Sequence, residues 1–244
     1  MVNLLFCLVQ VIKQPLKLFF PVKIYGKEKV NKQEKLILAL NHQSGWDPIL
    51  WTIWNRNHTR FMYKSSFDKN WLLRGAFNAL EFVSVDRGAV DLGAIKQAIS
   101  ILNDNKLFGV FPEGTRNKEV DCLQDFKVGT AMIAIKTQSP IRPVYIFDRA
   151  KAFHKNYMLV GEKFTLEQYY GKKLTRQVWE EATENIKQNL EQTRLELNAI
   201  LEQKGVKRRK RTKKEIRERE EFVLAKSSKL KDDKGQGEEQ ENSF

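Results

Sequence analysis

The chain has 244 residues, 41% of them hydrophobic, so it is long enough for one sizeable domain with a buried core. Its formal net charge of +13 at pH 7 suits an anionic substrate, an anionic lipid surface or nucleic acid. Its two cysteines, Cys7 and Cys122, exclude a disulfide framework and a cysteine-built zinc site, and they suit a reducing compartment.

Residues 1–26 are expected to form a membrane-associating element. About eleven mostly apolar residues precede Lys13, whereas a spanning helix needs roughly 20. The run lacks the preceding positive charge and the following small-residue cleavage site of a signal peptide. The next stretch mixes lysine with phenylalanine and leucine, which predicts a helical hairpin or an interfacial helix lying on a membrane. The alternative is a helix packed on its own domain.

Residues 27–203 alternate between strand and helix patterns. Apolar runs of strand length occur at 36–40, 60–64, 81–85, 107–111 and 141–147. Helical patterns start at Pro48 and cover 67–80, 91–105 and 126–138, and an amphipathic helix from Leu174 to Gln203 closes the domain. This alternation predicts an α/β fold with a largely parallel central sheet flanked by helices.

Residues 204–244 are expected to be a charged, disordered tail. The segment 204–219 holds ten Lys and Arg residues against two Glu, and the remainder is acidic and poor in apolar residues. Its basic part is expected either to attract anionic lipids or to remain a solvated tail.

The stretch NHQSGWDP, residues 41–48, places His42 and Asp47 directly after a predicted strand. Ligands gather at this end of parallel strands. If the loop reverses, Asp47 holds one ring nitrogen of His42 and leaves the other free as a base. The alternatives are that Asp47, followed by Pro48, only caps a helix and that His42 is structural.

Two other kinds of site are disfavoured around His42. The other histidines, His58 and His154, have no ligand spacing to it, which argues against a metal centre. Ser44 lacks the G-x-S-x-G surroundings of a nucleophile elbow, and Cys122 is interpreted as an incidental thiol.

A second constellation, FPEGTR at 111–116, follows another buried strand. Gly114 lets backbone N–H groups approach an anion, and Arg116 offers a bidentate fork to phosphate. Glu113 is interpreted as an ion-pair partner or a contact for substrate hydroxyls. Lys64 ends one predicted strand and Arg87 lies just after another, so together with Arg116 three cations are expected at one edge of the sheet beside His42.

Together these blocks resemble the glycerolipid acyltransferases, and most closely the 1-acylglycerol-3-phosphate acyltransferases. NHQSGWD is similar to the family's H-x4-D block, EFVSVDR to the second, FPEGTR to the third and IRPVYI to the fourth. Their order and spacing agree between about Val22 and Phe147. One departure is Glu81, where the family's second block usually begins with glycine.

The resemblance implies roles for individual residues. His42 would be the general base on the acceptor hydroxyl, oriented by Asp47. Substrate-binding positions carried over from the blocks are Lys64, Arg87, Glu113, Gly114, Thr115, Arg116 and Pro143, and the block of Pro143 would concern the acyl donor. The hydroxyl would attack the thioester directly, with no acyl-enzyme, metal or cofactor.

The resemblance also implies a membrane-associated enzyme at the cytoplasmic face that converts lysophosphatidic acid to phosphatidic acid. The donor would be acyl-acyl carrier protein or acyl-CoA, and an anionic membrane surface is an expected partner. Alternatives are another acceptor, such as glycerol 3-phosphate or a lysophospholipid, and a non-enzymatic basic lipid- or nucleic-acid-binding protein. No aromatic-rich recognition signature accompanies the basic runs, so nucleic acid is not expected as a partner.

Overall fold

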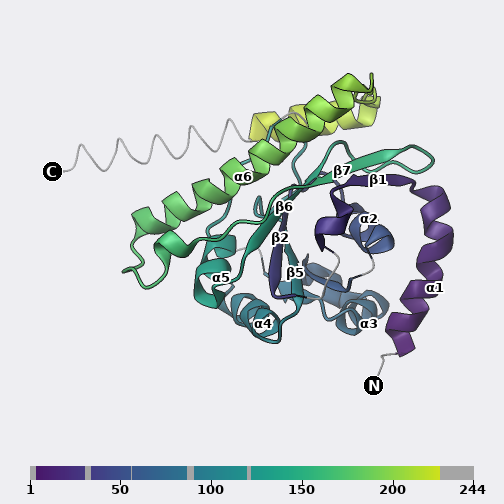
Figure 1. The fold of residues 1–244 in the computed structure, drawn as a ribbon. Coiled ribbons are helices and arrows are strands. Elements are labelled where there is room, and N and C mark those ends of the chain that lie inside the picture. Colours follow the sequence, from purple (N-terminus) through teal and green to yellow (C-terminus); the bar gives the residue numbers. More distant parts are fainter. Residues whose placement is uncertain (1–3, 31–33, 56, 87–90, 120–121, 226–244) are drawn as a thin grey trace. The chain divides into compact units, whose positions relative to one another are not determined.

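The computed structural model describes residues 4–30, 34–55, 57–86, 91–119 and 122–225 (Figure 1). The chain contains two units, residues 1–207 and residues 208–244. Arg87 lies outside the described residues, as does the part of the predicted tail beyond residue 225.

A seven-stranded sheet forms the centre of the first unit. Its strands are β1 (Val22–Tyr25), β2 (Leu36–Leu40), β3 (Thr59–Lys64), β4 (Val83–Val85), β5 (Leu107–Val110), β6 (Ile141–Ile146) and β7 (Asn156–Val160). Their order across the sheet is β1-β7-β6-β2-β5-β3-β4. Neighbouring strands are parallel except β6 and β7, which confirms the α/β fold with a largely parallel sheet.

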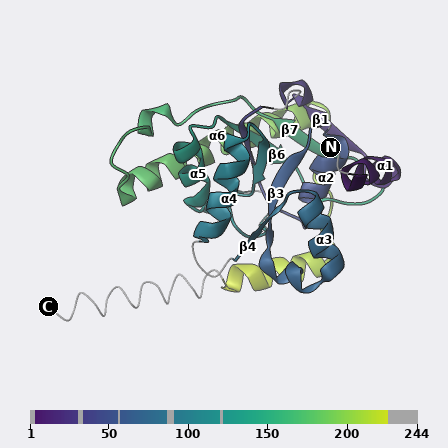
Figure 2. The same ribbon diagram turned by 90° about the horizontal axis from the view of Figure 1, so that it is seen from below.

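Helices cover both faces of this sheet. The α-helices are α1 (Leu4–Phe19), α2 (Asp47–Trp54), α3 (Trp71–Ala79), α4 (Leu92–Asn103), α5 (Gly129–Thr137) and α6 (Arg176–Gln203), and the 3₁₀ helices are η1 (Lys27–Val30), η2 (Ser65–Lys69) and η3 (Glu167–Tyr169). Figures 1 and 2 both place α1, α2 and α3 on one side of the sheet and α4, α5 and α6 on the other.

The central strand β2 is buried at all five positions because helices cover both of its faces. Leu36, Leu38 and Leu40 belong to the core on the α2 side. Ile37 and Ala39 belong to the core under α4, α5 and α6. The run LILAL therefore has the continuous apolar character of a two-sided buried strand, and its end places the following loop at an edge of the sheet.

Of the two forms predicted for the N-terminal segment, a helical hairpin or one interfacial helix, the structure has a single helix. One helix, α1, covers Leu4–Phe19 and is followed by strand β1, which pairs in parallel with β7. Residues 22–25 are thus part of the sheet, although they lie within the range expected for the membrane-associating element. Among the described residues, no helix combines the length and apolar character needed to cross a bilayer.

The strand predicted from residue 81 begins at Val83. Glu81 has φ 53°, and the backbone N–H of Phe82 donates to the carbonyl oxygen of Phe77, which ends α3 in the manner of a left-handed helix cap. Glycine is the residue that favours this conformation. The departure of Glu81 from the family pattern therefore falls at a turn, where its carboxylate forms an ion pair with Arg60.

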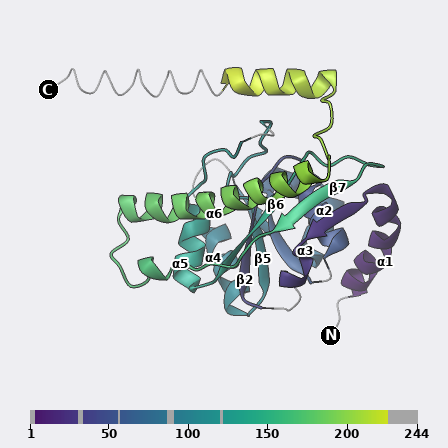
Figure 3. The same ribbon diagram turned by 45° about the horizontal axis from the view of Figure 1, so that its top comes forward.

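The second unit corrects the expectation of a wholly disordered tail. Residues 213–225 are helical (Figure 3). Thr212 and Glu215 form a reciprocal cap, since the Thr212 N–H donates to the Glu215 carboxylate and the Glu215 N–H donates to the Thr212 hydroxyl. Arg209 also pairs with Glu215. The low apolar content concealed this T-x-x-E start signal.

Candidate active site

His42 and Asp47 meet in the loop between β2 and α2. The distance from His42 Nδ1 to Asp47 Oδ2 is 2.9 Å, and both side chains are buried. The same carboxylate oxygen accepts the backbone N–H groups of Gln43 and Ser44, each at 2.7 Å. The loop therefore folds back as expected, and the carboxylate fixes both the ring and the backbone beside it.

The alternative reading of Asp47 as a helix cap is wrong. The N-cap position of α2 is Trp46, which makes no side-chain capping bond, and Asp47 is the first helical residue. Its carboxylate turns back toward the loop instead of satisfying the helix N–H groups. This leaves Pro48 as the local signal that starts α2.

The second ring nitrogen of His42 stays available. Within the described part of the chain, Nε2 has no hydrogen-bond partner, whereas Nδ1 faces the Asp47 carboxylate. With the proton on Nδ1, Nε2 carries the lone pair of a base. The ring of Phe111 stacks on the imidazole at a centroid distance of 4.2 Å and holds its plane.

The FPEGTR loop and the residue after it form hydrogen bonds with the backbone of His42. Glu113 Oε1 accepts the His42 N–H at 2.8 Å, and the N–H of Asn117 donates to the His42 carbonyl oxygen at 2.5 Å. The other carboxylate oxygen of Glu113 accepts the Gln124 N–H at 3.1 Å. Glu113 thus binds main-chain amides, and its contact with a substrate hydroxyl stays a prediction.

Burial dominates the electrostatics of Glu113. Desolvation raises the pKa of this carboxyl to about 7, against the opposing effect of its hydrogen bonds from His42 and Gln124. The neighbouring Asp47 raises the pKa further. Asn117 and Gln124 were missed by the sequence analysis. Asn117 directly follows FPEGTR, so its place in the chain was the available signal.

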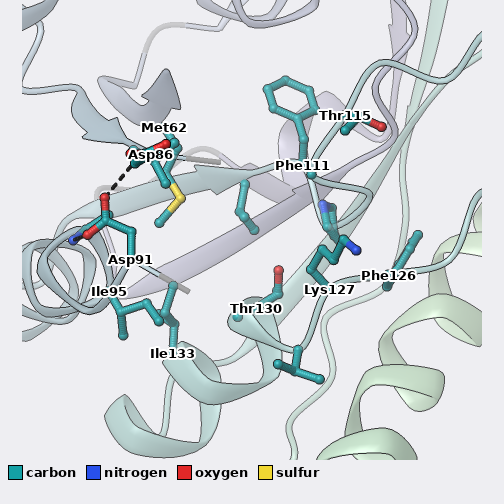
Figure 4. A pocket seen from close by; sticks show the side chains of 17 residues that line it. Met62, Asp86, Asp91, Ile95, Phe111, Thr115, Phe126, Lys127, Thr130 and Ile133 are labelled. Carbon is teal, nitrogen blue, oxygen red and sulfur yellow. Dashed lines mark hydrogen bonds between the residues drawn. The ribbon is translucent and has the colours of Figure 1, made fainter. Parts of the chain in front are cut away.

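An apolar cavity of about 510 Å³ opens beside this loop (Figure 4). Phe111 lines it and also stacks on His42, so one ring separates the cavity from the candidate base. The main apolar lining residues are Met62, Val85, Ile95, Val110, Phe126 and Ile133. Polar lining comes from Asp86, Asp91, Thr115, Lys127 and Thr130.

Gly114 and Thr115, two of the predicted substrate-binding positions, line the cavity. Gly114 has φ +68°, and a Cβ there would lie 3.1 Å from Cγ of Lys127, so glycine permits both the turn and the close approach. Lys127 is a cation at the cavity that the sequence analysis did not single out. It lies within the helix predicted at 126–138, and no motif marked it there.

The structure describes two of the three predicted cations, Lys64 and Arg116. Lys64 ends β3, and Arg116 lies in the loop after β5; both are exposed. Because β3 and β5 are parallel neighbours, these residues follow their strands at the same edge of the sheet. Val85 of β4 pairs with Lys64, which places the end of β4 at that edge too. Arg87 follows β4 outside the described residues.

Pro143 has a different setting. It is buried within β6, where it pairs with Ala39 of β2, and a Cβ at Gly161 would lie 2.8 Å from its Cγ and 2.4 Å from the Thr193 hydroxyl of α6. Pro143 therefore packs between the sheet and α6. This position gives it a structural contact, and its role in substrate binding stays a prediction.

Known proteins resemble the chain over the same region. A 1-acyl-sn-glycerol-3-phosphate acyltransferase of Borreliella burgdorferi is 27% identical over 54% of this chain and 54% of the relative. One of Bacillus subtilis is 30% identical over 50% of this chain and 60% of the relative. A putative one of Caenorhabditis elegans is 30% identical over 54% of this chain and 48% of the relative. The matches thus span about half the length of these curated relatives.

A solved structure and a family profile also match the chain. The crystal structure of the 1-acyl-sn-glycerophosphate (LPA) acyltransferase PlsC from Thermotoga maritima is similar, with a TM-score of 0.58 and 25% identity. That match covers 76% of this chain and 78% of the other. The profile of the family described as Acyltransferase matches residues 21–147. Because this profile covers more than half of the chain, the protein belongs to the Acyltransferase family.

Proposed function

We propose that the chain is a 1-acyl-sn-glycerol-3-phosphate O-acyltransferase, which moves an acyl group from an acyl thioester to the free hydroxyl of lysophosphatidic acid. The observation that carries the proposal is the buried pair of His42 and Asp47, 2.9 Å apart, with the imidazole stacked on Phe111, which lines an apolar cavity. The names of the relatives support the same acceptor.

In the proposed reaction, His42 Nε2 takes the proton of the acceptor hydroxyl while the hydroxyl oxygen attacks the thioester carbonyl carbon. The tetrahedral intermediate then breaks its C–S bond, and the imidazolium returns the proton to the leaving thiolate. Asp47 stabilises the imidazolium and fixes the ring through Nδ1. The products are phosphatidic acid and a free thiol on coenzyme A or acyl carrier protein.

The substrates have matching features on this edge of the sheet. Lys64, Arg116 and Lys127 supply the positive charge for the acceptor phosphate, with Arg87 as a further expected contact. The apolar cavity suits an acyl chain, because most of its lining is apolar and hydrocarbon buried there leaves water. Gly114 and Thr115 line this cavity and directly precede Arg116 in the chain.

The substrate and product are membrane lipids, so the proposal includes association with an anionic membrane surface at the cytoplasmic face. Helix α1 suits an interfacial position, since Leu18 and Phe19 are exposed near its C-terminal end beside Lys17.

The test is an assay of the full chain with labelled lysophosphatidic acid and an acyl thioester, beside the variants His42→Ala and His154→Ala. His154 is an exposed histidine whose ring contacts only a nearby backbone carbonyl in the described residues, so its replacement is the matched control. We expect phosphatidic acid from the unmodified protein and the control, and a loss of at least about a hundredfold for His42→Ala. Full activity of a folded His42→Ala variant would overturn the mechanism. Glycerol 3-phosphate as the preferred acceptor would overturn the assignment of lysophosphatidic acid.

A further inference from the structure

Helix α3 carries large apolar side chains but buries none of them fully. Trp71 and Leu72 are 77% and 63% exposed, and Leu73 of the same helix is also exposed. Phe67, in the preceding helix η2, is exposed as well. Asn70 caps the helix by accepting the N–H groups of Leu72 and Leu73, so this exposed turn is well formed. Phe67, Trp71, Leu72 and Leu73 are called the α3 patch below.

The α3 patch lies at the edge of the sheet that carries His42. The chain passes from the end of β3 through η2 into the start of α3, and both β2 and β3 run parallel to β5. The helix then returns to the opposite edge, where the Leu80 carbonyl oxygen lies 2.9 Å from His58 Nε2, just before β3. The patch is therefore at the first turn of α3, on the side of the sheet where the candidate base lies.

A second exposed apolar pair follows β2 at the same edge. Trp46 and Ile49 are 45% and 38% exposed, directly after the loop that holds His42. Two parallel strands thus each lead into exposed tryptophan and aliphatic side chains. In a soluble protein, large apolar groups gathered at one edge indicate an interaction surface.

Positive charge surrounds the α3 patch. Lys64, Lys69 and Arg74 are exposed around it. The acidic residue of this segment, Asp68, directs its carboxylate to the hydroxyl groups of Tyr63 and Ser84, each at 2.6 Å. Tryptophan and leucine with a lysine and arginine rim match a bilayer surface with anionic head groups. A second copy of the chain would bring two basic rims together, which disfavours self-association through this face.

We propose that the α3 patch inserts at the surface of an anionic bilayer, as a lipid contact additional to α1, and so holds the edge bearing His42 against the membrane. This inference rests on the proposed function, because a lysophosphatidic acid acceptor resides in that surface. It assigns to η2 and α3 a role in delivering the acceptor rather than in the chemistry.

The test compares the full chain with a Trp71→Ser/Leu72→Gln double variant and with Leu195→Gln. Leu195 is an exposed leucine on α6, on the other side of the sheet, and is the matched control. Co-sedimentation uses vesicles of phosphatidylcholine with and without phosphatidylglycerol. We expect the double variant to bind the anionic vesicles about tenfold more weakly and the control to bind unchanged. Amide hydrogen exchange of the unmodified chain should slow in residues 65–79 when the anionic vesicles are added.

Activity assays separate this inference from the proposed function. With a short-chain lysophosphatidic acid that stays dissolved as monomers, the double variant should match the unmodified protein, whereas with vesicle-bound acceptor its KM should rise. Equal vesicle binding by the double variant, or no slowing of exchange in 65–79, would overturn the docking role. A dimer that the double variant dissociates would assign the patch to a second copy instead. Absence of activity with every acceptor would refute the function while leaving the vesicle measurements to judge the patch.

Discussion

Replacing Asp47 with asparagine tests the proposed mechanism most directly. The carboxylate oxygen Oδ2 accepts His42 Nδ1 and the N–H groups of Gln43 and Ser44. An asparagine oxygen in the same place keeps the two backbone bonds and the position of the ring. The variant therefore removes the negative charge facing the imidazole while largely preserving the loop.

The expected magnitudes follow from these contacts. Hydrogen bonds to a charged group contribute about 1.5–3 kcal/mol and neutral ones about 0.5–1.5, so each of the three bonds weakens by roughly 1 kcal/mol. Relief from burying a charge offsets part of this loss. The asparagine amide nitrogen would replace Oδ1, a buried atom without a hydrogen-bond partner among the described residues, and would leave a donor unsatisfied. We expect a net loss of roughly 2 kcal/mol in the free energy of unfolding.

The effect on the reaction should be larger than the effect on stability. Without the carboxylate, the imidazolium formed on proton transfer loses its stabilising charge, and kcat should fall about a thousandfold. The assay is acyl transfer to lysophosphatidic acid, with folding checked by urea denaturation. Asp68→Asn is the control, since that carboxylate also accepts two hydrogen bonds but from residues outside the site. A folded Asp47→Asn variant with activity within threefold of the unmodified protein would refute the role of Asp47.

Three further predictions concern the phosphate site, the buried glutamate and the core. Lys64→Ala and Arg116→Ala should each raise the KM for lysophosphatidic acid about tenfold with little change in kcat. Neither variant should change the KM for a phosphate-free monoacylglycerol acceptor. An unchanged KM for lysophosphatidic acid would remove that residue from the phosphate site. Burial raises the pKa of Glu113 from 4.5 to about 7, so its contribution to the free energy of unfolding should fall by roughly 3 kcal/mol as pH rises from 4.5 to 7. Urea denaturation at pH 5 and 8 should show that Glu113→Gln lacks this pH dependence. Parallel pH profiles of stability for the variant and the unmodified protein would contradict the prediction. Gly109→Ala should lower the free energy of unfolding by about 1–3 kcal/mol or more, because a Cβ there would lie 2.2 Å from the ring of Phe61, and a melting temperature equal to that of the unmodified protein would contradict this packing.

Much of the sheet was predictable because its central strands are buried on both faces. LILAL and LFGV are continuous apolar runs, and the structure buries every residue of both. β1 and β7 escaped prediction for a physical reason as well. β1 is a four-residue edge strand with one fully buried residue, so VKIY has no clear apolar pattern, and its pairing with β7 joins segments far apart in the chain.

Local turn chemistry gave mixed results at the site. The reversal between His42 and Asp47 was predictable, because the short segment 41–47 joins a strand end to a helix start marked by Pro48. The partners of Asp47 were not. A carboxylate beside a proline has the sequence pattern of a cap, and only the fold shows it bonded to the preceding loop. The exposure of α3 was equally hidden, since WLLRGAF has the composition of a helix that packs on a core.

Glu113 shows why a motif identifies a residue without defining its contacts. Its partner, the N–H of His42, lies 71 positions earlier in the chain, and no local pattern encodes that pairing. The register of β2 against β5 determines this pairing. Ala39 pairs with Val110, and His42 and Glu113 each lie three residues further along. Two parallel strands that leave the sheet at the same level thus bring both motifs together.

This register makes the candidate base dependent on the core beneath it. Leu36, Leu38 and Leu40 face one core and Ile37 and Ala39 the other, so a slip of one residue would exchange the two faces of β2. The same slip would separate the His42 N–H from the Glu113 carboxylate and the Asn117 N–H from the His42 carbonyl. The packing of LILAL on both faces of the sheet therefore helps to fix the site, and polar substitutions deep in β2 should impair activity through the position of His42 as well as through stability.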